Sequence, residues 1–335
     1  MTSEKIKKKA IDLGFDSCGI IPANIFGQYA QALDERVKSF PASEKLYKAL
    51  YKFANPPENG KSCIVCLRRT NKYAMPDAHA GLFGKHYLFD GRLKYSEEHR
   101  AEKEFETFLA ANKINIIECD VPDRLAAAKA GLGKFGRNNF LYSMEYGSYV
   151  GIYCWVVDKE LEYDEICEDI RLSQCEDGCE KCVKSCPTNS LSGAFSMDRG
   201  TCIAHLFWDA GDILSEELRE QMSTWIYGCD VCQDVCPVNQ DKRNENEPFP
   251  LLEQFEEYMK PQNLLEMDEE TYKNIINPRF WYLGEEKLWL WKCNTLRSMI
   301  NSKNPKYHDQ IKAQKTHEDK RIREVAEWGC RKLGL

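Results

Sequence analysis

Long apolar runs and an excess of basic residues are both lacking from this sequence of 335 residues. The longest apolar run, Tyr149–Val157, would cross only about half of a bilayer, which argues against a helical membrane protein. The first residues, MTSEKIKKKAIDLGF, contain no apolar signal-peptide core, so we expect a cytoplasmic protein without a membrane partner. Lysine and arginine number 46 against 53 aspartate and glutamate, and the net charge of −7 argues against a generic nucleic-acid coat.

Composition divides the chain into three expected domains. Residues 1–165 mix helical patterns with short apolar runs and predict an α/β domain, residues 166–240 are rich in cysteine and turns, and residues 241–335 are helical. The clearest predicted elements of the first domain are one helix and two buried strands: Thr2–Leu13 with Ser3 as its N-cap, Ser62–Leu67 and Tyr149–Val157.

The tail from Lys287 to Leu335 is basic, although the whole chain is acidic. It holds twelve basic and five acidic residues, a balance of +7. Two predicted helices, Lys287–Ser302 and Asp319–Leu333, resemble a single helical-repeat unit. The basic face is interpreted either as a solvated helical surface or as a handle for phosphates.

Sixteen cysteines stand out, and in a cytoplasmic chain they indicate metal rather than a disulfide framework. Eight of them belong to two motifs that share the ending C-x2-C-x3-C-P. The first motif is Cys175-x3-Cys179-x2-Cys182-x3-Cys186-Pro187, and the second is Cys229-x2-Cys232-x3-Cys236-Pro237 with Cys202 upstream.

In two-cluster ferredoxins, three closely spaced thiolates hold one [4Fe–4S] cluster and the cysteine before proline ligates the other. The predicted ligands of the first cluster are Cys175, Cys179, Cys182 and Cys236. Those of the second are Cys186, Cys202, Cys229 and Cys232. Gly178 looks inserted into the first motif, which is the departure from the usual spacing. Structural zinc and unligated core cysteines are the alternatives.

The other eight cysteines are expected to lie outside the clusters: Cys18, Cys63, Cys66, Cys119, Cys154, Cys167, Cys293 and Cys330. Cys63 and Cys66 occupy a predicted strand, where alternation directs them to opposite faces. We therefore interpret this pair as core residues and not as a redox pair.

The stretch PDRLAAAKAGLGKFGRNNFLYSMEYGSYVGI (Pro122–Ile152), the double motif and the ending GCDVCQDVCPVN resemble the epoxyqueuosine reductase family. The resemblance covers essentially the whole chain. It implies an α+β protein with a nitroreductase-like cobalamin domain, a ferredoxin-like double-cluster domain and a short helical-repeat tail, related to reductive dehalogenases. The implied activity is a cobalamin-dependent reduction in queuosine synthesis on tRNA, fed by a low-potential donor of the flavodoxin or ferredoxin type.

Five residues are the expected cobalamin contacts: Gly131, Gly133, Asn138, Ser148 and Tyr149. The two glycines would permit a corrin to approach the backbone closely, and the short polar side chains suit hydrogen bonds to corrin amides. The alternative is that these residues simply form ordinary turns. The sequence contains no D-x-H-x-x-G signature, so we expect cobalamin to bind base-off without a histidine ligand.

One departure from the family concerns the proton donor. The family places an aspartate seven residues before the arginine that corresponds to Arg124, and this chain has Ile117 there. Glu118, Asp120 and Cys119 are the candidate replacements, since a carboxyl in an apolar site has a raised pKa and can act as a general acid.

The substrate is expected to differ from that of the family. The tail segment Asn277–Trp291, with Phe280, Trp281 and Tyr282, is aromatic where the family tends to be basic. Together with Ile117, this segment predicts a divergent member with an altered substrate and weak or no epoxyqueuosine reduction. The alternative functions are electron transfer or corrinoid handling without catalysis, and zinc-stapled nucleic-acid binding.

Overall fold

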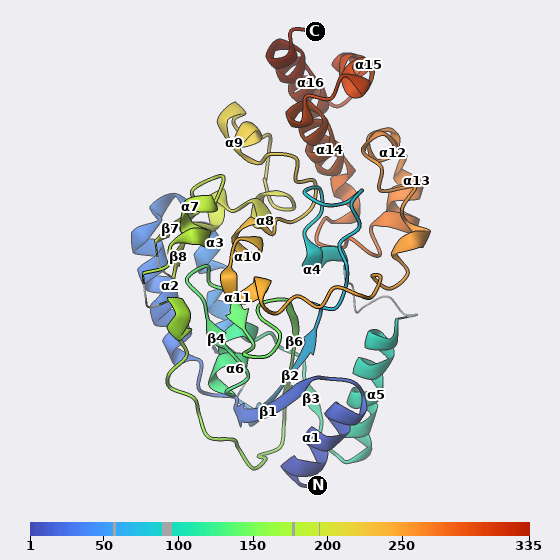
Figure 1. Cartoon of the computed structure of the whole chain (residues 1–335). Helices are drawn as coiled ribbons and strands as arrows, with labels where there is room; N and C mark the ends of the chain where they lie inside the picture. Colours follow the sequence, from blue (N-terminus) through green and yellow to red (C-terminus); the bar gives the residue numbers. More distant parts are fainter. Residues whose placement is uncertain (56–57, 89–95, 176–177, 194) are drawn as a thin grey trace. The chain divides into compact units, whose positions relative to one another are not determined.

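The computed structural model describes residues 1–55, 58–88, 96–175, 178–193 and 195–335 (Figure 1). The chain forms two compact units. Unit 1 combines Met1–Tyr73, Lys94–Gly200 and Val231–Asn246, and unit 2 combines Ala74–Leu93, Thr201–Asp230 and Glu247–Leu335. These units group the chain differently from the three expected domains, whose boundaries stay a prediction.

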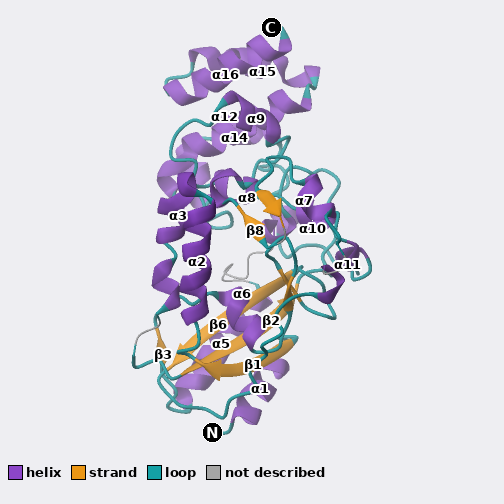
Figure 2. Ribbon diagram, turned by 90° about the vertical axis from the view of Figure 1, so that its left-hand side faces the viewer, coloured by secondary structure: helices purple, strands orange, loops and turns teal. Residues whose placement is uncertain are grey.

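Unit 1 is built on a four-stranded antiparallel sheet with the strand order β1-β2-β6-β3 (Figure 2). Its strands are β1 (Ser17–Pro22), β2 (Ser62–Arg69), β6 (Val150–Val157) and β3 (Ile116–Ile117). Both predicted strands are confirmed as β2 and β6. Two small hairpins accompany the sheet: β4 (Lys134–Phe135) with β5 (Leu141–Tyr142), and β7 (Leu191–Gly193) with β8 (Ser196–Met197).

Both faces of the sheet are buried, which agrees with strands whose apolar residues do not alternate with polar ones. Cys63 and Val65 of β2 belong to a core with helix α6 (Asp123–Lys129), whereas Ile64 and Cys66 belong to a core with α1 (Ser3–Asp12) and α5 (Glu97–Ala111). The predicted opposite orientation of Cys63 and Cys66 is therefore confirmed.

The N-cap of helix α1 (Ser3–Asp12) differs from the prediction. Ser3 lies inside the helix, and its hydroxyl donates to the Glu162 carbonyl oxygen at 2.8 Å, so it is not the N-cap. The cap position is Thr2, whose side chain makes no capping hydrogen bond. The other helices of unit 1 are α2 (Gly27–Ser39), α3 (Glu44–Lys48), α5 (Glu97–Ala111), α6, α7 (Lys181–Ser185), α10 (Val231–Asp234) and α11 (Pro237–Gln240).

Unit 2 is helical. Its α-helices are α4 (Lys85–Leu88), α8 (Ile203–Leu206), α9 (Glu216–Gln221), α12 (Pro261–Glu266), α13 (Glu269–Thr271), α14 (Leu288–Ser302), α15 (His308–Ala313) and α16 (Lys320–Leu333). Helices α14 and α16 confirm the two predicted tail helices, and they share a core that includes Leu296, Val325 and Trp328. No helix in the described part of the chain is long and apolar enough to cross a membrane.

The aromatic segment of the tail largely belongs to the core of unit 2. Phe280 and Trp291 are completely buried, and their rings pack on Tyr227 with centroids 5.1 and 5.4 Å away. Trp281 is exposed. Packing therefore explains most of a segment that the sequence alone placed among the arguments against tRNA.

Candidate functional site

Three of the motif cysteines in unit 1 lie on short helices or at the end of one. Cys182 is part of α7, Cys232 is part of α10, and Cys236 is the N-cap of α11, whose first residue is Pro237. Proline at the first helical position lacks only an N–H that would have no intrahelical partner. Helices α7 and α10 pack against each other, which brings the two motifs together within this unit.

The four predicted ligands of the first cluster are neighbours. Burial, together with the nearby thiolates of Cys175, Cys236 and Cys179, raises the pKa of Cys182 to about 11. Burial also raises the pKa of Cys175, with contributions from Cys236 and Cys179. Four soft sulfur donors that destabilise one another's negative charge fit a bound cationic iron–sulfur core, which would relieve that repulsion.

The second predicted set is divided between the units. Cys186 and Cys232 belong to unit 1, and Cys202 and Cys229 belong to unit 2. Among the described residues, no group of three or more histidine, cysteine, aspartate or glutamate side chains is arranged to hold a single metal ion.

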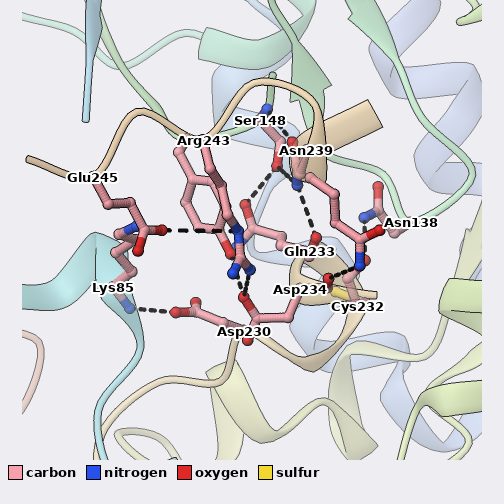
Figure 3. A network of polar contacts seen from close by, with 12 residues as sticks. Lys85, Asn138, Ser148, Asp230, Cys232, Gln233, Asp234, Asn239, Arg243 and Glu245 are labelled. Carbon is pink, nitrogen blue, oxygen red and sulfur yellow. Dashed lines mark hydrogen bonds and ion pairs between the residues drawn. The ribbon is translucent and has the colours of Figure 1, made fainter. Parts of the chain in front are cut away.

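Three of the predicted cobalamin residues contact the second cysteine motif (Figure 3). The Asn138 amide donates to the carbonyl oxygen of Cys232 at 3.0 Å, and the Ser148 hydroxyl donates to Gln233 at 2.8 Å. The Tyr149 hydroxyl donates to Asp234 at 2.8 Å. These polar groups thus have partners inside unit 1, and their assignment to cobalamin stays a prediction.

Asn239 completes this network. Its side-chain oxygen accepts from the Ser148 backbone N–H at 2.8 Å, and its amide donates to the Ser148 hydroxyl at 2.8 Å and the Gln233 carbonyl at 2.9 Å. Gly147 makes room for it, because a β-carbon there would lie 2.5 Å from the Asn239 oxygen. These hydrogen bonds attach segment Val231–Asn246 to Ser148, which lies just before strand β6 of unit 1.

The two predicted cobalamin glycines differ in their surroundings. Gly131 has a φ of +73°, and a β-carbon there would meet nothing within 4 Å. Gly133 is closely packed, because its β-carbon would lie 2.7 Å from the backbone oxygen of Tyr142. Gly131 therefore leaves open space beside the backbone, as the prediction requires, whereas Gly133 is explained by packing alone.

Tyr142 is the aromatic residue beside the first cluster motif. It is 1% exposed, its hydroxyl accepts a hydrogen bond from the Asn138 amide at 2.9 Å, and it interacts electrostatically with Cys236. Burial raises the pKa of Tyr142, so the hydroxyl keeps its proton. Sequence reasoning did not single out this residue, because nothing local links it to Cys236.

The predicted replacements for the family acid lie at the surface. Glu118 and Asp120 are exposed, and an Asp120 oxygen lies 3.8 Å from the Lys52 ammonium group. Ile117 and Cys119 pack against the core that contains α6, and burial raises the pKa of the Cys119 thiol. The Arg124 guanidinium donates to the Asn139 carbonyl at 3.0 Å and lies over the Phe140 ring.

Asp123, in the first turn of α6, has the raised carboxyl pKa that was expected of Asp120 or Glu118. Solvent reaches the residue, yet desolvation by the surrounding protein raises the pKa of its carboxyl to about 6. The Cys154 thiol of β6 hydrogen-bonds with this carboxyl and lowers the pKa, as does the charge of Arg124, while Asp120 raises it. A signal for it is present in the sequence, because Asp123 directly precedes Arg124 within the stretch Pro122–Ile152 that carries the family resemblance.

Comparisons with known proteins agree with these features. Residues 174–239 match a family described as a 4Fe-4S double cluster binding domain. The epoxyqueuosine reductase of Cellulophaga algicola is 30% identical over 261 residues, which cover 74% of this chain and 82% of that protein.

Two solved structures have the same fold. A selenomethionine-labelled epoxyqueuosine reductase has a TM-score of 0.75 at 22% identity, covering 98% of this chain and 90% of that chain. An epoxyqueuosine reductase with an epoxyqueuosine-modified tRNA-Tyr stem loop has a TM-score of 0.71 at 21% identity, covering 99% and 98%. The sequence similarity and the shared α+β fold lead to one conclusion: this chain belongs to the epoxyqueuosine reductase family of oxidoreductases.

Proposed function

We propose that this protein reduces epoxyqueuosine in tRNA, with two [4Fe–4S] clusters as its electron path and Asp123 as its proton donor. The observation that carries the proposal is the pairing of two features of unit 1. Four cysteine thiols, the proposed ligands of one cluster, interact electrostatically with one another, and a carboxyl of raised pKa lies close in sequence to the position of the family acid.

Cobalamin is the second cofactor of the proposal, bound base-off and reduced through the clusters. Its support is the resemblance of Pro122–Ile152 and the open space beside Gly131. When bound, a corrin supplies an electron-rich cobalt for two-electron reduction chemistry, while the protein orients the substrate and delivers protons. A low-potential flavodoxin- or ferredoxin-type donor would supply the electrons.

The protons must come from the chain. Removal of an epoxide oxygen as water needs two electrons and two protons. The Asp123 carboxyl holds a proton over a wider pH range than an ordinary aspartate, because desolvation disfavours its charge. Arg124 and the half-buried Tyr29 lie close enough to interact electrostatically with each other and with Asp123.

The basic tail is the proposed contact for tRNA phosphates. Exposed lysines surround α15: Lys303, Lys306, Lys312, Lys315 and Lys320. Arg297 of the same tail is buried and donates to backbone carbonyls, so it is excluded from this surface. Contacts of this kind make affinity fall as salt rises.

The proposal is tested by single-turnover reduction of epoxyqueuosine-containing tRNA with anaerobically reconstituted, reduced protein loaded with cobalamin. We expect stoichiometric product. Loss of product when only cobalamin is omitted would support the cofactor assignment. Cluster-loaded protein that binds cobalamin but yields no product would contradict the proposal and favour the predicted altered substrate or an electron-transfer role.

The pH dependence of that reaction should report Asp123. Proton donation needs the protonated carboxyl, so the single-turnover rate should fall about tenfold per pH unit above the pKa of about 6. Cys154→Ala removes a hydrogen bond that lowers this pKa, so the falling limb should move to higher pH. Asp120→Asn removes a charge that raises the pKa, so the limb should move to lower pH.

Opposite shifts in these two variants are the discriminating result. The groups around Asp123 that must be considered are Cys154 of β6, Cys63 of β2, which hydrogen-bonds with Cys154, and Arg124 and Asp120. That hydrogen bond and burial hold the pKa of Cys154 well above its usual range, so this thiol does not titrate in the same window. A limb that stays in place in both variants would exclude Asp123 as its origin.

A further inference from the structure

Unit 2 contains a small cavity lined by helices α9, α14 and α16 and by the loop before α9. Its volume is about 20 Å³, which is room for one particle of the size of a water molecule. Most of the lining side chains are apolar, among them Leu214, Leu290 and Val325. The lining also includes two buried arginines, Arg219 of α9 and Arg297 of α14, which are 3% and 2% exposed.

Both arginines carry buried N–H groups that the chain leaves without an acceptor. Among the residues that the structure describes, Nε and Nη1 of Arg219 and Nε of Arg297 have no hydrogen-bond partner. The Nη2 atom of Arg219 donates to the Glu324 carboxylate at 2.8 Å. The two Nη atoms of Arg297 donate to the carbonyl oxygens of Ser223 and Trp225. Buried donors are normally satisfied, so an acceptor from outside the chain is expected in the cavity.

The charge of Arg297 is not balanced by a carboxylate. Arg219 forms an ion pair with Glu324, whereas no carboxylate in the described part of the chain forms one with Arg297. Asp212, the acidic residue of the lining, is exposed, and its side chain accepts from a backbone N–H. The Cys293 thiol, one turn before Arg297, stays neutral because burial raises its pKa to about 12. Arg297 is thus a buried cation without a counterion.

We propose that this cavity binds one monatomic anion, chloride in a cell, which accepts hydrogen bonds from the N–H groups of Arg219 and Arg297 and connects α9 with α14. Such an ion supplies both the missing acceptor and the missing negative charge. A cavity with room for one water-sized particle cannot hold the several atoms of a phosphate or a carboxylate. The inference does not depend on the proposed function, because these helices carry no predicted cluster ligand.

The first test needs no variant. Crystals of the full chain are grown with potassium bromide in place of chloride and measured at the bromine absorption edge. We expect an anomalous peak in the cavity, within hydrogen-bonding distance of both guanidinium groups. A cavity that holds density without anomalous signal would contain water only, and the inference would be overturned.

The second test measures melting of the full chain in solution. Chloride is replaced stepwise at constant ionic strength by gluconate, an anion too large for the cavity. Tryptophan fluorescence reports unit 2, because every tryptophan except Trp155 belongs to it. Wild type is compared with Arg297→Met and with Arg323→Met. Arg323 of α16 is the matched control, since its guanidinium donates to backbone carbonyls and it does not line the cavity.

In wild type and in Arg323→Met, we expect the melting temperature to rise with chloride. Above the Kd, the unfolding equilibrium constant of unit 2 should fall about tenfold for each tenfold rise in chloride. Arg297→Met should show no such dependence. The same dependence in Arg297→Met as in wild type would place the chloride effect elsewhere and overturn the inference. A bromide peak with no chloride effect on wild type would mean binding at crystal concentration only, which also overturns it. If Arg297→Met does not fold, the crystals and the wild-type melting decide.

Discussion

Asp123→Asn should slow single-turnover reduction of epoxyqueuosine-containing tRNA by about 10²–10⁴-fold, the usual loss when a positioned general acid is removed. Asn keeps the size of the side chain and cannot donate a carboxylic proton. Asp120→Asn and Glu118→Gln should each cost far less, because the carboxyl that the protein desolvates and that interacts with the Cys154 thiol is that of Asp123. If the single-turnover rate instead collapsed in either of those variants while Asp123→Asn stayed active, the general acid would be Asp120 or Glu118.

A rescue variant sharpens this test. Ile117 occupies the family's acid position and packs against the same core as Cys119 and α6. Ile117→Asp in the Asp123→Asn background should recover part of the lost rate by restoring a carboxyl there. Failure of the rescue, with cluster content and tRNA binding unchanged, would mean that the substrate reaches Asp123 differently from the family acid.

Stability provides the control for unfolding. The pKa of Asp123 is raised in the folded protein, so folding favours its protonated form, and this contribution is lost as pH rises through about 6. Asp123→Asn should therefore melt no lower than wild type at about pH 8, where wild type carries the disfavoured charge. A melting temperature well below wild type would assign the loss of rate to damage of the fold.

Cys182→Ala should reduce the iron content from about eight to about four atoms per chain, because one of two four-iron clusters loses a ligand. Cys232→Ala should remove the other cluster, since Cys232 belongs to the second predicted set. Cys167→Ala is the matched control: this cysteine of unit 1 lies outside both motifs, and its thiol contacts the Asp169 carbonyl.

Metal analysis and electron paramagnetic resonance of the three proteins decide between interpretations. Zinc at one or two atoms per chain with no iron after anaerobic reconstitution would refute the cluster assignment. Loss of the same cluster signal in Cys182→Ala and Cys232→Ala would mean that the crossing of ligands between motifs has been assigned wrongly. Only the second outcome leaves the Asp123 experiment unaffected, because that experiment needs a protein that holds iron–sulfur clusters.

Local patterns allowed the elements to be predicted, and long-range contacts limited the site. The strands β2 and β6 and the helices α14 and α16 follow from apolar runs and periodicity, which are properties of neighbouring residues. Asp123 acquires its raised pKa from burial within a fold that brings Cys154 of β6 and Asp120 beside it. No spacing in the sequence announces such a contact, so the exposed Asp120 was the more obvious candidate.

Polar residues near the second motif illustrate the same limit. Ser148 was a plausible corrin donor, because a short hydroxyl before a buried strand suits that role. Its partners Gln233 and Asn239 come from a segment far along the chain, and only the folded structure shows that they use the hydroxyl. Phe280 was counted as an argument against tRNA, but it is a buried core residue. A buried aromatic residue and one that faces tRNA cannot be told apart in a sequence.

The discontinuous composition of unit 1 has a consequence for the order in which the molecule is made. Segment Val231–Asn246 returns to unit 1 after the chain has contributed Thr201–Asp230 to unit 2. A nascent chain that ends before Cys236 has three of the four proposed ligands of the first cluster, and its Ser148 lacks Gln233 and Asn239. We therefore expect this cluster to be inserted only after the ribosome has passed Cys236, and a truncated chain of residues 1–200 would be a poor choice for studying it.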